Sequence, residues 1–219
     1  MKNDYTHIIF LLDRSGSMSS CEEDVIGGFA QFLKDQQKAK GKATFTLIQF
    51  DDKYEINCTF ANIDQVLPLS KNTFQPRGST ALIDAFCRAI DETGDKLSIL
   101  NEENRPAKVL FVVYTDGFEN ASHKFKTKDL NDRISIQRDT YNWQFIFLGA
   151  DQDAIATAGA LGIARGTTLN CSSTKTVHAF SSLSDTIIKY RNASPDVYNS
   201  ANVVAVCGFT DKDRDENKQ

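Results

Sequence analysis

Residues 8–18 read Ile8-Ile9-Phe10-Leu11-Leu12-Asp13-Arg14-Ser15-Gly16-Ser17-Met18. The first five of these residues are all apolar, and such a short run predicts a β-strand that is buried on both faces. The strand ends at Asp13, and Ser15 and Ser17 follow at alternate positions, with Gly16 between them to ease a tight turn. Open α/β sheets place their ligand sites at the carboxyl ends of such strands. One carboxylate and two hydroxyls are hard oxygen donors, which suit Mg²⁺, Mn²⁺ or Ca²⁺ better than zinc or copper.

The composition is that of a folded α/β domain. The chain has 219 residues, of which 41% are hydrophobic, and its formal net charge is −4. That acidic balance argues against a general surface for nucleic acid or anionic membranes. No apolar run approaches the roughly 18 residues needed to span a bilayer. The first strand follows Lys2-Asn3-Asp4 directly and is too short for the core of a secretory signal, so we expect a cytoplasmic protein.

The cysteines support the same expectation. The chain has five of them, an odd number, and no Cys-x-x-Cys pair occurs. They are Cys21, Cys58, Cys87, Cys171 and Cys207. This pattern favours buried free thiols in a reducing compartment over a disulfide framework or a zinc site.

The rest of the chain alternates between strand-like and helix-like segments. Further strands are expected over 45–50, 54–60, 109–114, 144–148 and 166–170, and helices over 22–39, 81–100, 129–139, 151–161 and 174–190. The segment 54–60 follows a turn at Asp51-Asp52 and is expected to be an antiparallel edge strand. The fold class is therefore α/β, with a mostly parallel, doubly wound six-stranded sheet and helices on both faces.

We expect one domain with a C-terminal appendage. Residues 1–192 contain all of the predicted strands and long helices. Residues 193–210 include an apolar segment from Asn202 to Phe209 and are expected to pack on the domain as an extension. Residues 211–219 have almost no apolar content, which predicts a disordered tail.

Two other polar clusters are expected at the same edge of the sheet as Asp13. Gly78-Ser79-Thr80 opens a predicted helix, and Thr115-Asp116-Gly117 follows a predicted buried strand. Right-handed crossovers bring the carboxyl ends of parallel strands to one edge, so these side chains should converge. Taken alone, Thr80 could be a helix cap and Asp116 a turn residue. Their joint occurrence with Asp13 favours a cation-binding site over these separate local roles.

The three clusters together resemble the metal-ion-dependent adhesion site (MIDAS) of von Willebrand factor A (vWA) domains. Asp13-x-Ser15-x-Ser17 comes first, Thr80 lies in a Gly-Ser-Thr loop, and Asp116 follows a buried strand. The resemblance covers the strand and helix order of residues 5 to about 190. It implies a Rossmann-like sheet that binds one divalent cation.

The resemblance also implies roles for the site residues. Ser15, Ser17 and Thr80 would be hydroxyl ligands, and Asp13 and Asp116 would act directly or through ordered water. The expected cation is Mg²⁺ or Mn²⁺ in preference to Ca²⁺. In the family, the remaining ligand is typically an Asp or Glu side chain of a partner protein. The chain is therefore expected to be a metal-dependent protein-binding module and not an enzyme.

Residues beside the predicted ligands are candidates for contact with that partner. They are Arg14, Ser79, Glu119, His123 and Lys124. His123 and Lys124 lie in a basic loop that also holds Lys126 and Lys128. This loop either steers an acidic partner through a local positive field or is simply a solvated loop.

The alternative function is a metal-dependent phosphohydrolase of the haloacid-dehalogenase type, which also begins with an apolar strand that ends in Asp. That chemistry needs a second acid two residues after the nucleophile, where this chain has Ser15. It also needs a paired acid late in the sheet, and here Asp116 is followed by Gly117. Both differences count against the enzyme.

Overall fold

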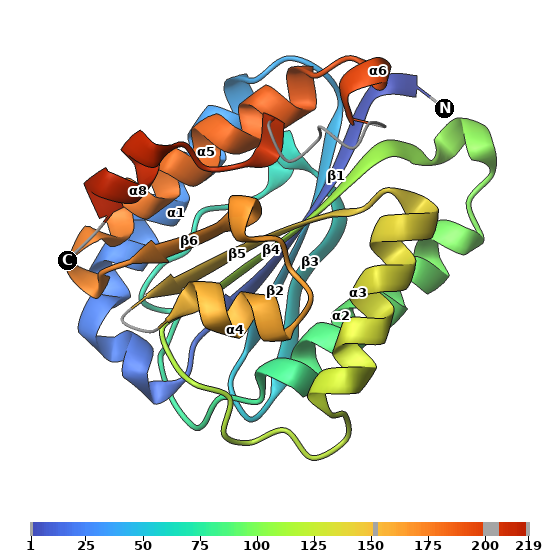
Figure 1. Ribbon diagram of the computed structural model, residues 1–219. Coiled ribbons are helices and arrows are strands. Elements are labelled where there is room, and N and C mark those ends of the chain that lie inside the picture. The colour runs from blue at the N-terminus through green and yellow to red at the C-terminus, as the bar shows by residue number, and fades with distance from the viewer. Residues whose placement is uncertain (1, 151–152, 199–205, 218–219) are drawn as a thin grey trace.

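A computed structural model describes residues 2–150, 153–198 and 206–217. Its centre is a six-stranded sheet with the strand order β3-β2-β1-β4-β5-β6 (Figure 1). The strands are β1 (Lys2–Asp13), β2 (Ala43–Phe50), β3 (Tyr54–Asn62), β4 (Pro106–Thr115), β5 (Gln144–Ala150) and β6 (Thr168–Cys171). All neighbouring pairs are parallel except β2 and β3, which are antiparallel. The predicted fold class is confirmed, including the antiparallel edge strand.

Helices cover both faces of the sheet (Figure 1). The long helices are α1 (Glu22–Lys38), α2 (Leu82–Ser98), α3 (Thr127–Tyr141) and α5 (Thr176–Asn192), and the short ones are α4 (Ala154–Ala160), α6 (Pro195–Tyr198) and α8 (Asp211–Asn217). Single 3₁₀ turns are η1 (Gly16–Cys21), η2 (Ile63–Gln65), η3 (Glu102–Asn104), η4 (Arg165–Thr167) and η5 (Ser173–Lys175). The predicted helix over 151–161 begins at Ala154 among the described residues.

The apolar run in β1 divides between the two faces because alternate residues of a strand point in opposite directions. Ile8, Phe10 and Leu12 belong to the core layer beneath α1 and α5, and Ile9 and Leu11 belong to the layer beneath α2, α3 and α4. The rings around Phe10 are those of Phe29 and Phe32 in α1, Phe45 in β2 and Phe180 in α5. This double burial is why residues 8–12 of β1 are all apolar.

The second core layer fixes the position of α2. Phe86 of α2 stacks on Phe111 of β4 with ring centroids 4.7 Å apart. Phe145 of β5 continues the row, 5.8 Å from Phe111. Since Phe86 lies on the first turns of α2, this packing sets where the helix begins relative to the sheet.

His7 is a buried neutral side chain of β1 that contacts side chains of β2 and of the edge strand β3. It is completely buried, stacks on Phe60 with ring centroids 3.8 Å apart, and its ring nitrogens lie 2.9 and 3.3 Å from the hydroxyls of Thr44 and Thr46. Burial lowers the pKa of His7 from 6.5 to about 3. This setting gives His7 a structural role.

This burial predicts a loss of stability in mild acid. Below pH 6.5 the unfolded chain protonates His7 while the folded protein does not until about pH 3, so the free energy of unfolding falls by about 1.4 kcal/mol per pH unit across that window. Between about pH 6.5 and about pH 4.5, urea unfolding of the parent should therefore lose about 2 kcal/mol more than His7→Gln loses. The exposed His178 provides the control, because His178→Gln should decline as the parent does. Equal declines in all three proteins would contradict the assignment.

The C-terminal segment differs from its prediction, because residues 211–217 form helix α8 rather than a disordered tail. Thr210 and Asp213 cap each other, since Thr210 donates its backbone N–H to the Asp213 carboxylate at 2.7 Å and accepts from the Asp213 N–H at 3.2 Å. Arg214 donates to the carbonyls of Thr168, Arg165 and Gly166. Capping and backbone contacts order this polar segment without apolar burial. Residues 218–219 lie outside the described residues.

The segment before α8 joins the core beneath α1 and α5. Tyr198, Cys207 and Phe209 are buried there, and the Phe209 N–H donates to the Gly166 carbonyl at 2.9 Å. Residues 199–205 of the expected extension lie outside the described part of the chain.

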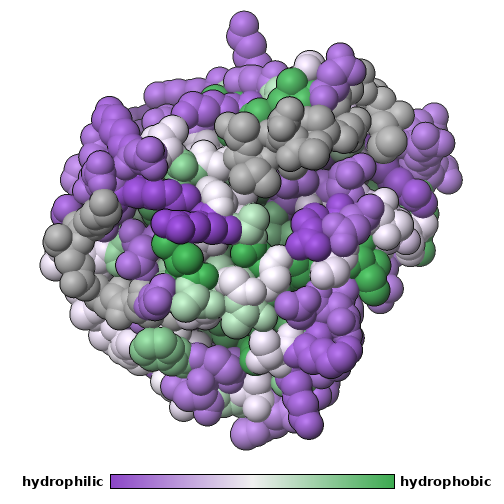
Figure 2. All heavy atoms as spheres, in the orientation of Figure 1, coloured by the Kyte–Doolittle hydropathy of each residue, from purple (hydrophilic) through white to green (hydrophobic). Residues whose placement is uncertain are grey.

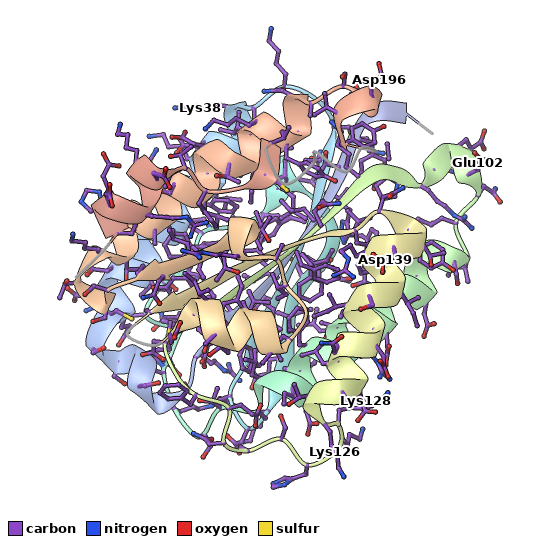
Figure 3. All side chains as sticks on the ribbon, in the orientation of Figure 1. Lys38, Glu102, Lys126, Lys128, Asp139 and Asp196 are labelled. Atoms are coloured by element: carbon purple, nitrogen blue, oxygen red, sulfur yellow. The ribbon has the colours of Figure 1, made fainter. Side chains whose placement is uncertain are left out.

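The five cysteines carry thiols, as predicted, and all but the half-buried Cys58 are buried. Polar residues cover the outer faces of the helices, and apolar residues gather over β6 and α4 (Figure 2). Labelled side chains such as Lys38, Lys126 and Asp139 project outward (Figure 3). No described helix is long and apolar enough to cross a membrane.

Candidate metal site

The three polar clusters converge at the carboxyl edge of the sheet, at the lower left in Figure 1. Asp13 ends β1 and Thr115 ends the adjacent parallel strand β4. Thr80 lies two residues before the start of α2, and its loop joins the first cluster through a hydrogen bond from the Gly16 N–H to the Gly78 carbonyl at 3.2 Å. The predicted convergence of clusters that are far apart in sequence is therefore found.

Three hydroxyls face one point beside Gly117. The Oγ atoms of Ser15 and Ser17 are 3.1 Å apart, and Ser17 donates to Asp116 Oδ1 at 2.6 Å. A Cβ atom placed on Gly117 would lie 3.2 Å from Ser17 Oγ, 3.2 Å from Thr80 Oγ1 and 3.8 Å from Ser15 Oγ. We call this arrangement of Ser15, Ser17 and Thr80 the hydroxyl cradle. It is open on the side of Gly117 because glycine has no side chain.

Asp13 lies behind the cradle as a buried carboxylate. It is completely buried and accepts the Ser15 N–H at 2.7 Å and the Thr115 hydroxyl at 2.6 Å. Burial raises the pKa of Asp13 to about 6, although these hydrogen bonds oppose the rise. Thr115 was not among the predicted site residues, and its only signal in the sequence is its position beside Asp116 at the end of a buried strand.

An ion-pair network centred on the buried Arg14 and Asp51 joins the loops next to the cradle. Asp51 is completely buried and accepts from Arg14 Nε at 3.1 Å and from Arg77 Nε at 2.9 Å. Glu55 binds the other ends of both guanidinium groups, and the hydrogen bond from Arg14, with a smaller contribution from Arg77, lowers the pKa of Glu55 to about 2. Because Arg14 precedes Ser15 and Arg77 precedes Thr80 by three residues, the network holds two of the ligand-bearing loops together.

Two of the residues predicted to contact a partner, Arg14 and Glu119, bind other groups of the protein itself. Arg14 is only 4% exposed and binds Asp51 and Glu55. The prediction that Arg14 contacts a partner is therefore wrong. Glu119 is half-buried and accepts the N–H groups of Ile83, Ala121 and Ser122. Its carboxylate holds the loop after Asp116 against α2, which is a structural role that the sequence did not reveal.

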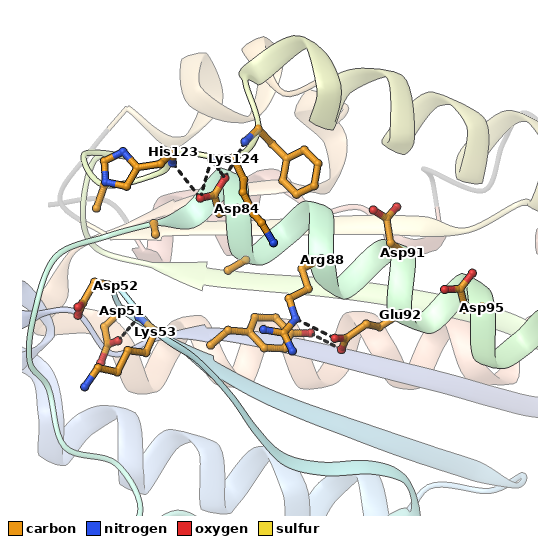
Figure 4. A pocket seen from close by; sticks show the side chains of 15 residues that line it. Asp51, Asp52, Lys53, Asp84, Arg88, Asp91, Glu92, Asp95, His123 and Lys124 are labelled. Atoms are coloured by element: carbon orange, nitrogen blue, oxygen red, sulfur yellow. Dashed lines mark hydrogen bonds and ion pairs between the residues drawn. The ribbon is translucent and has the colours of Figure 1, made fainter.

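The other three candidate contact residues are accessible. Ser79, His123 and Lys124 are exposed. Figure 4 shows His123 and Lys124 on the loop beside the start of α2. Their contact with a partner stays a prediction. Phe118, which is not among the predicted contact residues, is 66% exposed directly after Gly117.

The chemistry of these donors fits a hard divalent cation. All of the converging atoms are oxygens from hydroxyls and carboxylates, which Mg²⁺ and Mn²⁺ prefer. Across residues 2–150, 153–198 and 206–217, no group of three or more His, Cys, Asp or Glu side chains could hold a metal ion.

Comparisons with known proteins agree on the fold. No family model matches the sequence, and neither does any curated protein. Among solved structures, proximal thread matrix protein 1 from the mussel byssus, with a zinc-occupied MIDAS motif, is 17% identical with a TM-score of 0.54 and matches over 93% of this chain and 46% of that one. A von Willebrand factor type A protein from Catenulispora acidiphila is 15% identical with a TM-score of 0.53, over 84% and 43% of the two chains.

A third match is of nearly the same size as this chain. The vWF domain of the type V pili tip protein Mfa5 from Porphyromonas gingivalis is 10% identical with a TM-score of 0.58, over 83% of this chain and 94% of that domain. The chain spans less than half the length of the first structures that it matches. Together these matches show that the chain has the vWA fold.

Proposed function

We propose that this chain is a protein-interaction module that binds a partner through one divalent cation held in the hydroxyl cradle. Ser15, Ser17 and Thr80 would hold the ion, with Asp13 and Asp116 acting directly or through water. The convergence of three hydroxyls on one point beside Gly117 is the observation that carries the proposal. The zinc-occupied MIDAS motif of proximal thread matrix protein 1, which shares the fold, supports the proposal.

The charge of the donors favours an acidic partner. Mg²⁺ takes six oxygen ligands and loses its waters reluctantly. Where Asp13 and Asp116 act through water, the neutral cradle hydroxyls leave most of the charge of the cation uncompensated. Asp13 already accepts hydrogen bonds from the Ser15 N–H and the Thr115 hydroxyl, which favours that arrangement. An anionic ligand from outside is therefore strongly favoured, and the Asp or Glu side chain of a partner protein supplies one.

The same residues favour recognition over catalysis. Ser15 occupies the position where a phosphohydrolase of the alternative class needs its second acid, and the Ser15 hydroxyl faces the cradle. The odd number of cysteines, with no Cys-x-x-Cys pair, favours a reducing compartment, and we include the cytoplasm in the proposal. The preferred cation in the proposal is Mg²⁺ or Mn²⁺.

Panning a random peptide display library on the immobilised protein tests this function. In Mg²⁺, elution with EDTA should recover peptides that share an Asp or Glu, and each should lose binding when that acid is changed to its amide. The Thr80→Ala protein should recover no such peptides. Peptides that bind equally in EDTA, or that need no acid, would contradict the proposal.

A further inference from the structure

Helix α2 has no N-cap of its own. The residue before its first turn is Ala81, which has no side chain to cap the helix. The free N–H groups are instead bound by the loop after Asp116. Glu119 Oε2 accepts from the Ile83 N–H at 2.8 Å, and Ser122 Oγ accepts from the Asp84 N–H at 3.0 Å. The loop thus satisfies the donors that a helix normally satisfies with its own N-cap.

The helix binds the loop in return through Asp84. Its carboxylate accepts the backbone N–H groups of three consecutive residues, His123 at 2.8 Å, Lys124 at 3.1 Å and Phe125 at 2.8 Å. Figure 4 shows Asp84 directed at the loop, beside a groove of about 460 Å³ between α2, the turn after β2 and the loop. Because both carboxylate oxygens are used, the amide of asparagine could not replace them.

This reciprocal capping also involves a predicted metal ligand. The Thr80 N–H donates to Asn120 Oδ1 at 2.9 Å, and the Thr80 carbonyl accepts from the N–H groups of Asn120 and Ala121 at 3.0 and 3.2 Å. The backbone of Thr80 is therefore bonded on both sides to the loop that begins at Asp116. The spacing between Thr80 and Asp116 depends on how that loop is held against α2.

We propose that Asp84 is a positioning residue for the metal site, which fixes Asp116 relative to Thr80 by holding residues 123–125 against the start of α2. This role rests on the proposed function, because it concerns the same cation. Asp84 does not face the cradle and is not a ligand. It acts through the backbone, as residues that support metal ligands do, and changing such residues typically lowers metal affinity about 10- to 100-fold.

The test compares Asp84→Asn with Asp95→Asn. Asp95 is exposed on the same helix, so its variant makes the same charge change without any contact to the loop. Hydrogen exchange of the metal-free proteins should show faster exchange of the amides of residues 123–125 in Asp84→Asn alone. Calorimetry at a temperature where all three proteins are folded should show Mg²⁺ affinity about tenfold lower in Asp84→Asn, and unchanged in Asp95→Asn.

The outcomes separate the two proposals. Faster exchange with unchanged Mg²⁺ affinity would overturn the positioning role and leave the proposed function standing. Unchanged exchange in Asp84→Asn would show that the carboxylate does not hold the loop, which also overturns it. If the parent binds no Mg²⁺, the proposed function and the positioning role fall together.

Discussion

Gly117→Ala should lower the affinity for Mg²⁺ at least about tenfold and leave the protein folded, at a cost in stability of up to about 1–3 kcal/mol for the added methyl group. The new methyl group would lie 3.2 Å from the hydroxyl oxygens of Ser17 and Thr80, in the space that they face. No ligand is removed, and the backbone of Gly117 is not in the left-handed region that favours glycine. The effect should therefore come from filling the cradle. Isothermal titration calorimetry measures the affinity, and thermal unfolding measures the stability.

Gly27→Ala is the matched control for this variant. Gly27 is exposed in α1, and a Cβ there would meet nothing within 4 Å. The same change should leave Mg²⁺ affinity unaltered and stabilise the helix by about 0.5–1 kcal/mol. If Gly117→Ala bound Mg²⁺ as tightly as Gly27→Ala, the ion could not occupy the space that the three hydroxyls face.

Asp51→Asn should destabilise the protein by about 3 kcal/mol, because it removes the shared partner of two guanidinium groups. Arg14 is only 4% exposed and would keep Glu55 as its single acidic neighbour. The amide would keep the acceptor for the Lys53 N–H, which Asp51 Oδ1 binds at 2.6 Å. The loss therefore comes from the ion pairs and not from the turn. Urea unfolding at neutral pH measures it.

The adjacent Asp52 provides the control for Asp51. It is exposed, so Asp52→Asn makes the same chemical change outside the network and should shift the free energy of unfolding by no more than about 0.5 kcal/mol. Similar losses in the two variants would mean that the buried network contributes little beyond a general charge effect.

The sequence predicted the sheet because its signals are local. Apolar runs such as 8–12 and 109–114 mark strands that are buried on both faces, and four of the five predicted ligands lie at or just after the ends of these strands. A parallel sheet then places those ends together without further information. For this reason the sequence brings Asp13, Ser15, Ser17 and Asp116 to one edge, and Thr80 joins them there from the loop before α2.

The side chains that hold the predicted ligands in place form hydrogen bonds between residues far apart in sequence, which no local pattern reveals. Thr115 binds Asp13 across 102 residues of sequence, and Arg14 turns inward to Asp51 across 37 residues. Arg14 follows a ligand residue in the chain, which suggested an outward position, but its partner lies inside. The C-terminal helix was missed for a different reason. Low hydropathy predicted disorder there, although Thr210 and Asp213 form a recognisable capping pair.

Calorimetric titration of the metal-free protein with Mg²⁺ tests the central claim most directly, with Thr80→Ala, Asp116→Ala and Ser79→Ala measured beside the parent. Thr80 is part of the cradle, whereas the neighbouring Ser79 is exposed. Comparing the two alanine variants therefore distinguishes the loss of a ligand from the loss of any nearby hydroxyl. We expect the parent and Ser79→Ala to bind one ion with equal affinity, and binding to be lost or much weaker in Thr80→Ala and Asp116→Ala. A parent that binds no ion, or four proteins that bind it equally, would contradict the assignment of the site.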